Sequence, residues 1–196
     1  MPSPGEIRAR FDRLQEQVGP GVTIVAATKY VPLADMAALV DAGVRVVGEN
    51  RAQDLEAKHA EYGDAFRWHF IGHLQSNKVK VVNGICELVH SLDTDTAARR
   101  LEIPALLQVN LAGEGSKSGV APEEIAAYLG YDVVGLSTMP PAAATAEESR
   151  PWFRRLRELA GEHGLNELSM GTTQDYAVAV EEGATYVRVG SILFRQ

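Results

Sequence analysis

The chain has 196 residues, of which 45% are hydrophobic and 23% are charged, and its formal net charge is −7. An acidic chain without a stripe of Lys and Arg lacks the electrostatic footprint of a nucleic-acid-binding protein, and anionic membrane surfaces are disfavoured for the same reason. The length and composition are typical of one globular domain over residues 1–196.

The N-terminus and the cysteine usage indicate the compartment. Residues 1–14 lack the apolar region of a signal peptide, and no segment approaches the roughly 20 apolar residues of a membrane span. A cytoplasmic protein is therefore expected. Cys86 is the only cysteine, so an internal disulfide is excluded, and its surroundings, GICELVH, predict a buried, inert thiol at the start of a strand.

Strand-like and helix-like segments alternate along the chain after an expected N-terminal helix over 6–18. Apolar, β-branched runs predict eight strands over 22–29, 44–50, 67–74, 86–92, 104–111, 132–139, 167–171 and 185–190. The stretches between them predict helices over 32–43, 51–63, 76–84, 93–101, 121–129, 147–164 and 175–184. The first two of these end at a glycine, which is a helix C-cap signal, and the sixth repeats its apolar residues at helical spacing.

Near-continuous apolar strands that alternate with helices are typical of a parallel sheet covered by helices. An open doubly wound sheet and a closed barrel both fit this pattern. The first strand-to-helix loop, ATKYVPLAD, lacks the G-x-G-x-x-G fingerprint, which weakens the open sheet without excluding it. Eight strands fit barrel closure directly. We therefore predict a single (β/α)8 TIM-type barrel with an additional N-terminal helix.

In such a barrel the carboxyl ends of the strands share one rim, where active sites form. Polar groups dominate the predicted strand ends, and each alone has an ordinary structural role, but their convergence favours a ligand site. The residues at these ends are Lys29, Glu49, Asn50, His73, Asn110, Ser137, Thr138, Met139, Ser169, Gly171, Thr172, Thr173, Arg188, Gly190 and Ser191.

Lys29 and the last two loops suggest the chemistry of that ligand. A lysine at the end of an apolar strand is either a surface residue or a reactive amine. The loops SMGTT and VGS offer glycines and hydroxyls, which suit a phosphate but also suit tight turns. A phosphate opposite an amine fits a sugar phosphate or pyridoxal 5′-phosphate, and Arg188, embedded in YVRVG, favours the latter because a pyridine nitrogen could accept from it.

Six motifs occur in order along the chain: ATK at 27–29, GEN at 48–50, WHFIGHLQSNK at 68–78, QVNL with GEGSKSGV within 108–120, ELSMG at 167–171 and VRVGS at 187–191. Together they resemble the pyridoxal phosphate homeostasis protein family, whose fold is similar to the barrel domain of alanine racemase. The resemblance covers nearly the whole chain. It implies that Lys29 carries pyridoxal phosphate as an internal aldimine and that Arg188 faces the pyridine nitrogen. The other residues that it implies at the cofactor are Ser169, Gly171, Gly190 and Ser191 around the phosphate, and Asn50, His73 and Met139 around the ring.

The chain departs from the usual pattern of this family at two loops. The usual SMGMS is SMGTT here, and the usual GTxIFG is GSILFRQ, so that Ser191 keeps a hydroxyl while Arg195 replaces a glycine. His69 is expected to be a structural histidine. Lys117 lies in the GEGSKSG loop and is expected to be a solvated lysine. His59, His90 and His163 are scattered along the chain, so no metal site is expected.

The resemblance favours a carrier of pyridoxal phosphate in intracellular vitamin B6 and amino-acid homeostasis, with little or no catalysis of its own. Arginine only donates, so a ring nitrogen that faces Arg188 stays unprotonated and the ring is a weak electron sink. The expected partners are the cofactor and apo forms of enzymes that use it, and a monomer is expected. An amino-acid racemase is the alternative, although Tyr30 is poorly placed as its second acid–base group. A Schiff-base sugar-phosphate aldolase is a weaker alternative.

Overall fold

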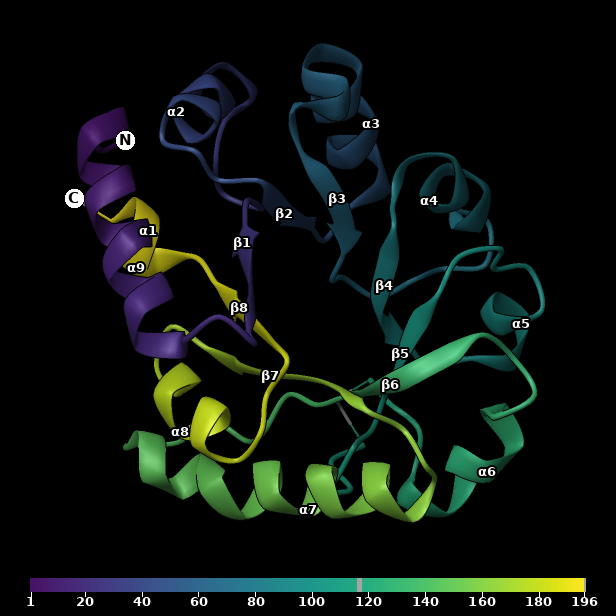
Figure 1. Ribbon diagram of the computed structural model, residues 1–196. Helices are drawn as coiled ribbons and strands as arrows, with labels where there is room; N and C mark the ends of the chain where they lie inside the picture. The colour runs from purple at the N-terminus through teal and green to yellow at the C-terminus, as the bar shows by residue number, and fades with distance from the viewer. Residues whose placement is uncertain (116–117, 196) are drawn as a thin grey trace.

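Eight parallel strands close into a barrel in this computed structural model, which describes residues 1–115 and 118–195 (Figure 1). Each strand pairs with the next along the chain, and β8 pairs with β1. The strands are β1 (Thr23–Ala27), β2 (Val46–Glu49), β3 (Arg67–Phe70), β4 (Leu88–Leu92), β5 (Ala105–Gln108), β6 (Val133–Ser137), β7 (Glu167–Thr172) and β8 (Tyr186–Val189). The predicted barrel and N-terminal helix are confirmed. Most strands are shorter than predicted, because the polar residues at their carboxyl ends belong to loops.

Helices surround the barrel and connect successive strands (Figure 1). In the described part of the chain they are α1 (Pro4–Val18), α2 (Met36–Asp41), α3 (Ala52–Tyr62), α4 (Val79–Ile85), α5 (Asp95–Ala98), α6 (Ile125–Tyr128), α7 (Arg150–Glu162), α8 (Tyr176–Glu181) and α9 (Ser191–Phe194). The segments predicted as helices over 93–101 and 121–129 contain much shorter helices, and the second begins with a 3-10 turn over Pro122–Glu124.

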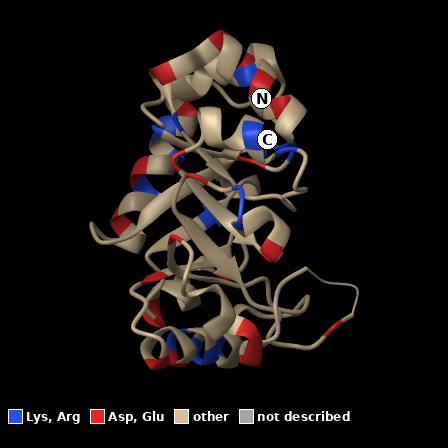
Figure 2. Ribbon diagram, turned by 90° about the vertical axis from the view of Figure 1, so that its right-hand side faces the viewer, with Lys and Arg blue, Asp and Glu red and all other residues tan. Residues whose placement is uncertain are grey.

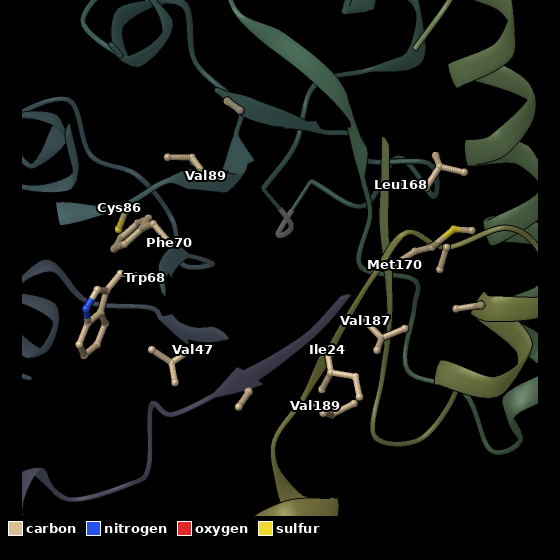
Figure 3. Packing of buried hydrophobic residues seen from close by; sticks show 14 of the residues in the cluster. Ile24, Val47, Trp68, Phe70, Cys86, Val89, Leu168, Met170, Val187 and Val189 are labelled. Atoms are coloured by element: carbon tan, nitrogen blue, oxygen red, sulfur yellow. The ribbon is translucent and has the colours of Figure 1, made fainter. Parts of the chain in front are cut away.

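The outward faces of the strands form the main hydrophobic core against the helices. Alternate strand residues such as Ile24, Trp68, Met170 and Val187 are buried there, and Figure 3 shows them among their neighbours. Cys86, also in Figure 3, is buried in the same core, and burial raises the pKa of its thiol to about 12. It follows helix α4 directly and strand β4 begins only at Leu88, so the predicted start of this strand is wrong although the thiol is buried.

The residues between these apolar positions point into the barrel, because side chains alternate between the two faces of a strand. Several of these inward residues are polar, and His69, His90, Ser169 and Arg188 are all buried. They come from β3, β4, β7 and β8. The strands therefore carry an apolar outer face, which packs against the helices and provides stability, and several polar side chains on the inner face, which extend towards the carboxyl ends of the strands.

Helix α1 packs beside the last segment of the chain and holds it in place (Figure 1). The helix begins at a capping box, in which the Ser3 hydroxyl accepts from the Glu6 amide and the Glu6 carboxylate accepts from the Ser3 amide. Arg10 Nη1 donates to the carbonyl of Leu193 at 3.2 Å and to that of Arg195 at 2.5 Å. These contacts fix residues 193–195 near the carboxyl ends of β8 and β1.

Charged residues lie mainly on the outer helices, where both signs alternate (Figure 2). Glu182, just after α8, is buried and accepts ion pairs from Arg150, Arg154 and Arg157 of α7 at 3.0–3.2 Å. This cluster joins the two helices that flank β7. None of the described helices is long and apolar enough to cross a membrane.

Candidate functional site

A cleft of about 630 Å³ opens at the carboxyl ends of β8 and β1, a volume within the usual range for small-molecule sites. It brings together residues from both ends of the chain, including Lys29, Thr172, Thr173, Arg188, Gly190, Ser191 and Arg195. Of the residues predicted at the site from sequence, Lys29, Arg188, Gly190 and Ser191 therefore share one cleft.

The cleft is cationic in an acidic protein. Its lining contains the charged groups of Lys29, Arg188 and Arg195, and among the described lining residues the only side-chain carboxylate is that of Asp35. The chain as a whole has a net charge of −7. A concentration of positive charge inside a concave site attracts and holds an anionic ligand. Arg195 is an addition to the predicted site, because from sequence it is noticed only as a replacement for a glycine.

Lys29 lies two residues beyond the end of β1, in the turn that leads to α2. Its side chain is exposed, and its Nζ lies 4.8 Å from the centroid of the Tyr30 ring, a cation–π contact. The amine is thus accessible from the cleft. The predicted strand end is wrong by two residues, because the strand stops at Ala27 and Thr28 starts a turn.

A buried network holds the peptide that precedes Lys29. Lys58 Nζ, on α3, donates to the Thr28 carbonyl at 2.8 Å and to Glu49 Oε1 at 2.5 Å. The Thr28 hydroxyl donates to the same carboxylate oxygen at 2.5 Å. Glu49 is fully buried and Lys58 is 5% exposed. The sequence motif GEN contains Glu49, but nothing in the sequence marks Lys58 as its partner, since lysines on surface helices are ordinarily solvated.

A β-bulge in β7 brings Thr172 to the cleft. Ser169 pairs with Tyr186 and Thr172 with Arg188, so the β7 strand has one residue more than β8 between these pairs. Gly171 lies in this bulge with φ +91°, and a Cβ there would be 2.6 Å from the Cβ of Ala179. Only glycine fits both the backbone angle and the space. Gly171 therefore shapes the site without lining the cleft.

The loops after β7 and β8 are joined directly. The Gly190 amide donates to Thr173 Oγ1 at 3.2 Å, and the Thr172 amide and hydroxyl both donate to Asp175 Oδ1. The two threonines stand where the family pattern has Met-Ser, and one of them links the two loops predicted to hold a phosphate. The hydroxyls of this region are thus held close to the cationic groups of the cleft.

Arg188 forms the floor of the cleft. Its Nη1 donates to the Ser169 carbonyl at 3.0 Å and to Ser169 Oγ at 2.5 Å, and its Nη2 donates to the Thr138 carbonyl at 2.8 Å and to Met139 Sδ at 3.0 Å. All these partners are uncharged. Burial lowers the pKa of Arg188 to about 10, so the group remains a cation at neutral pH.

Two buried histidines are connected to Arg188 through Ser169. His69 Nδ1 lies 2.9 Å from His90 Nε2, and His90 Nδ1 lies 2.7 Å from Ser169 Oγ. Burial lowers the pKa of His69 to about 4 and that of His90 well below its usual range. His69 is structural, as predicted. The expectation that His90 is a scattered histidine is wrong, because β3 and β4 bring the two rings together.

The remaining predicted site residues lie outside the cleft. Met139 is half-exposed and lines a neighbouring hollow, His73 is exposed with its Nδ1 3.4 Å from Asp93 Oδ2, and Asn50 is partly buried beyond β2. Ser169 is fully buried beneath Arg188 rather than at the cleft surface. Burial raises the pKa of Asp93. Lys117 lies outside the described residues.

Comparisons of the sequence and of the structure with known proteins point to the same group of relatives. The profile of the alanine racemase N-terminal domain matches residues 3–196. The chain is 38% identical to the pyridoxal phosphate homeostasis protein of Aquifex aeolicus, over 94% of this chain and 92% of that protein. It also resembles PipY of Synechococcus elongatus, solved without pyridoxal phosphate (TM-score 0.88, 35% identity) and with it bound (TM-score 0.85, 34% identity); both comparisons cover 96% of this chain and 99% of the other.

Proposed function

The chain belongs to the pyridoxal phosphate homeostasis protein family, and we propose that it binds pyridoxal 5′-phosphate in the cleft and holds it on Lys29 as a Schiff base. One observation carries this proposal: the cleft places an accessible lysine amine beside two arginines and several hydroxyls. In forming the link, Nζ of the neutral amine adds to the aldehyde carbon, a C=N bond forms and water leaves.

The lining of the cleft fits this cofactor. The phosphate of the cofactor is a dianion, and the described lining of the cleft contains three cationic side chains and one side-chain carboxylate. The pyridine nitrogen of the cofactor can accept a hydrogen bond. Both Nη atoms of Arg188 already donate to the protein, whereas no hydrogen bond of its Nε is found among the described residues, so Nε is the donor left for the pyridine nitrogen. When bound, the cofactor supplies an aldehyde and an electron-withdrawing ring. The residues of the chain bind the phosphate, orient the ring and present the amine.

The same residues favour a carrier over a racemase. Arg188 donates but does not accept, so it keeps a facing ring nitrogen unprotonated and weakens the ring as an electron sink. Racemisation also needs an acid–base group on each face of the cofactor. Tyr30, beside Lys29, is 86% exposed, and no hydrogen bond in the described part of the chain holds its hydroxyl. We propose a single-domain cytoplasmic monomer that stores the cofactor, supplies it to apo enzymes and supports amino-acid homeostasis.

Solvent exchange at an amino-acid substrate tests this role. The protein loaded with pyridoxal phosphate, incubated with L-alanine in deuterated water, is expected to give little deuterium at Cα and no D-alanine. Proton NMR of the alanine and chiral chromatography measure the two products. Rapid exchange accompanied by D-alanine would show that the loaded protein is a racemase and that the carrier proposal is wrong.

Arg195→Ala is expected to weaken binding of pyridoxal phosphate about tenfold, the size of one charge-assisted hydrogen bond. Binding of pyridoxal, which lacks the phosphate, should change little. Fluorescence titration of the two ligands measures the effect as a ratio of affinities. Lys80→Ala, an exposed cation on α4 outside the cleft, is the control. Equal losses for both ligands would mean that Arg195 does not act on the phosphate.

A further inference from the structure

A continuous hydrogen-bonded chain of side chains crosses the interior of the barrel and ends at the floor of the cleft. His69, His90, Ser169 and Arg188 follow one another with heavy-atom distances of 2.9, 2.7 and 2.5 Å. They come from β3, β4, β7 and β8, and each residue is at most 9% exposed. The Tyr186 ring packs against both imidazoles, with centroid distances of 6.0 and 5.2 Å.

The chemistry of the four groups fixes the direction of these hydrogen bonds. Arg188 has only donors, so Ser169 Oγ accepts from it. The only remaining partner of this hydroxyl in the described structure is His90 Nδ1, which therefore accepts the Ser169 hydrogen. His90 is then protonated on Nε2 and donates to Nδ1 of His69. The imidazole of His69 consequently has its own hydrogen on Nε2.

The four hydrogen-bonded side chains, His69, His90, Ser169 and Arg188, include no carboxylate. The positive charge of Arg188 is therefore not neutralised by its partners in this network. Both histidines stay neutral because they are buried, and the charges that act on them, Arg67 near His69 and Arg188 near His90, are also positive. The acid whose charge acts on Arg188 is Asp175, and its carboxylate is bound to Thr172. The guanidinium is thus held by neutral partners on the barrel side and lines the cleft on the other.

We propose that His90, supported by His69, is a positioning residue that fixes Ser169 Oγ as an acceptor and so holds Arg188 in one orientation. The planar guanidinium then has its Nη hydrogens bound and its Nε hydrogen left for an acceptor in the cleft. This inference rests on the proposed function, since that acceptor is the ring nitrogen of pyridoxal phosphate. Without His90, the Ser169 hydroxyl has no acceptor for its own hydrogen, so it rotates and weakens one of the four hydrogen bonds that orient the guanidinium.

The first test uses the protein without cofactor, so its outcome does not depend on the proposed function. Nitrogen-15 NMR of protein labelled at histidine and arginine, with the five histidines assigned by single substitutions, should show His69 and His90 as neutral Nε2–H tautomers at pH 7. The Arg188 Nε–H signal should shift or broaden in His90→Leu. It should be retained in His90→Asn, whose amide oxygen replaces Nδ1 as acceptor. An Nδ1–H tautomer of His90, or an unchanged Arg188 signal in folded His90→Leu, would overturn the proposal.

The second test uses the loaded protein and a matched pair of serines. Ser169→Ala and His90→Leu should weaken binding of pyridoxal phosphate about tenfold and alter the pH titration of its visible absorbance band. His90→Asn should restore the wild-type titration. Ser91→Ala removes another buried hydroxyl, which donates to the Gly72 carbonyl and takes no part in the hydrogen-bonded chain, and should have no such effect. Wild-type titrations in Ser169→Ala would overturn the inference, whereas a wild-type protein that binds no cofactor would overturn the proposed function alone.

Discussion

Replacing Lys58 by methionine is expected to lower the free energy of unfolding by about 3–5 kcal/mol, as in other proteins that lose one partner of a buried ion pair. The substitution leaves the fully buried Glu49 carboxylate without its cation. Glu49 Oε2 already has no hydrogen-bond partner among the described residues, so no second contact of this carboxylate compensates for the loss of Lys58. The Thr28 carbonyl also loses a donor, and cofactor binding at the adjacent Lys29 should weaken as well.

Two further variants make this prediction specific to the buried pair. Lys80→Met removes an exposed lysine and should change the free energy of unfolding by no more than about 0.5 kcal/mol. The double variant Glu49→Leu with Lys58→Met removes both charges and should recover much of the stability lost in the single variant. Urea denaturation followed by circular dichroism measures all three. A single Lys58→Met variant as stable as Lys80→Met would contradict a stabilising role for the pair.

Acidification from pH 6.5 to pH 4 is expected to destabilise the protein by about 3 kcal/mol through His69 alone, with a further loss through His90. Burial lowers the pKa of His69 from 6.5 to about 4, and that of His90 is lowered as well. Between these pH values the unfolded chain binds protons that the native histidines do not, so stability rises with pH. The contribution is fully present above pH 6.5 and is lost progressively as the pH falls.

The free energy of unfolding, measured by urea denaturation at several pH values, reports this effect. His69→Asn should flatten the slope between pH 4 and pH 6.5. His163→Gln, which removes a histidine at the end of α7 outside the buried chain, should retain the wild-type slope. If His69→Asn and the wild type lose stability in parallel, the buried imidazole is not the cause of the acid sensitivity.

The barrel could be predicted from sequence because its signal is local and repeated. Each strand is a short apolar run and each is followed by a helix-like segment, so the order of elements alone indicates parallel pairing and closure. Lys29, Arg188, Gly190 and Ser191 could also be predicted, since all lie at or near the carboxyl ends of the first and last strands, which are neighbours in a closed barrel.

The partners of these residues could not be predicted in the same way. Lys58 resembles any helix-surface lysine in sequence, and only the packing of α3 on β2 shows that it is buried against Glu49. The contact of His69 with His90 depends on the register of β3 and β4, which sequence patterns do not determine. Arg195 enters the cleft because α1 binds the end of the chain, a contact between residues 185 positions apart.

The placement of Lys29 also bears on how a carrier works. Its amine is exposed at the rim, whereas Arg188 and Ser169, which we propose orient the ligand, are buried below. On the proposed function, a cofactor bound to Lys29 would have its covalent link near solvent and its ring near Arg188. An amine from another molecule could then reach this link without any opening of the barrel, which would suit the proposed release of the cofactor to an acceptor.

The covalent attachment of pyridoxal phosphate to Lys29 is tested most directly by locating it. The loaded protein is reduced with borohydride, which makes the link permanent, then digested and analysed by mass spectrometry. The expected result is a phosphopyridoxyl group on the peptide that contains Lys29, one per chain, which is lost in Lys29→Arg. A group found on another lysine, or none on a protein that still binds the cofactor, would contradict the proposed role of Lys29.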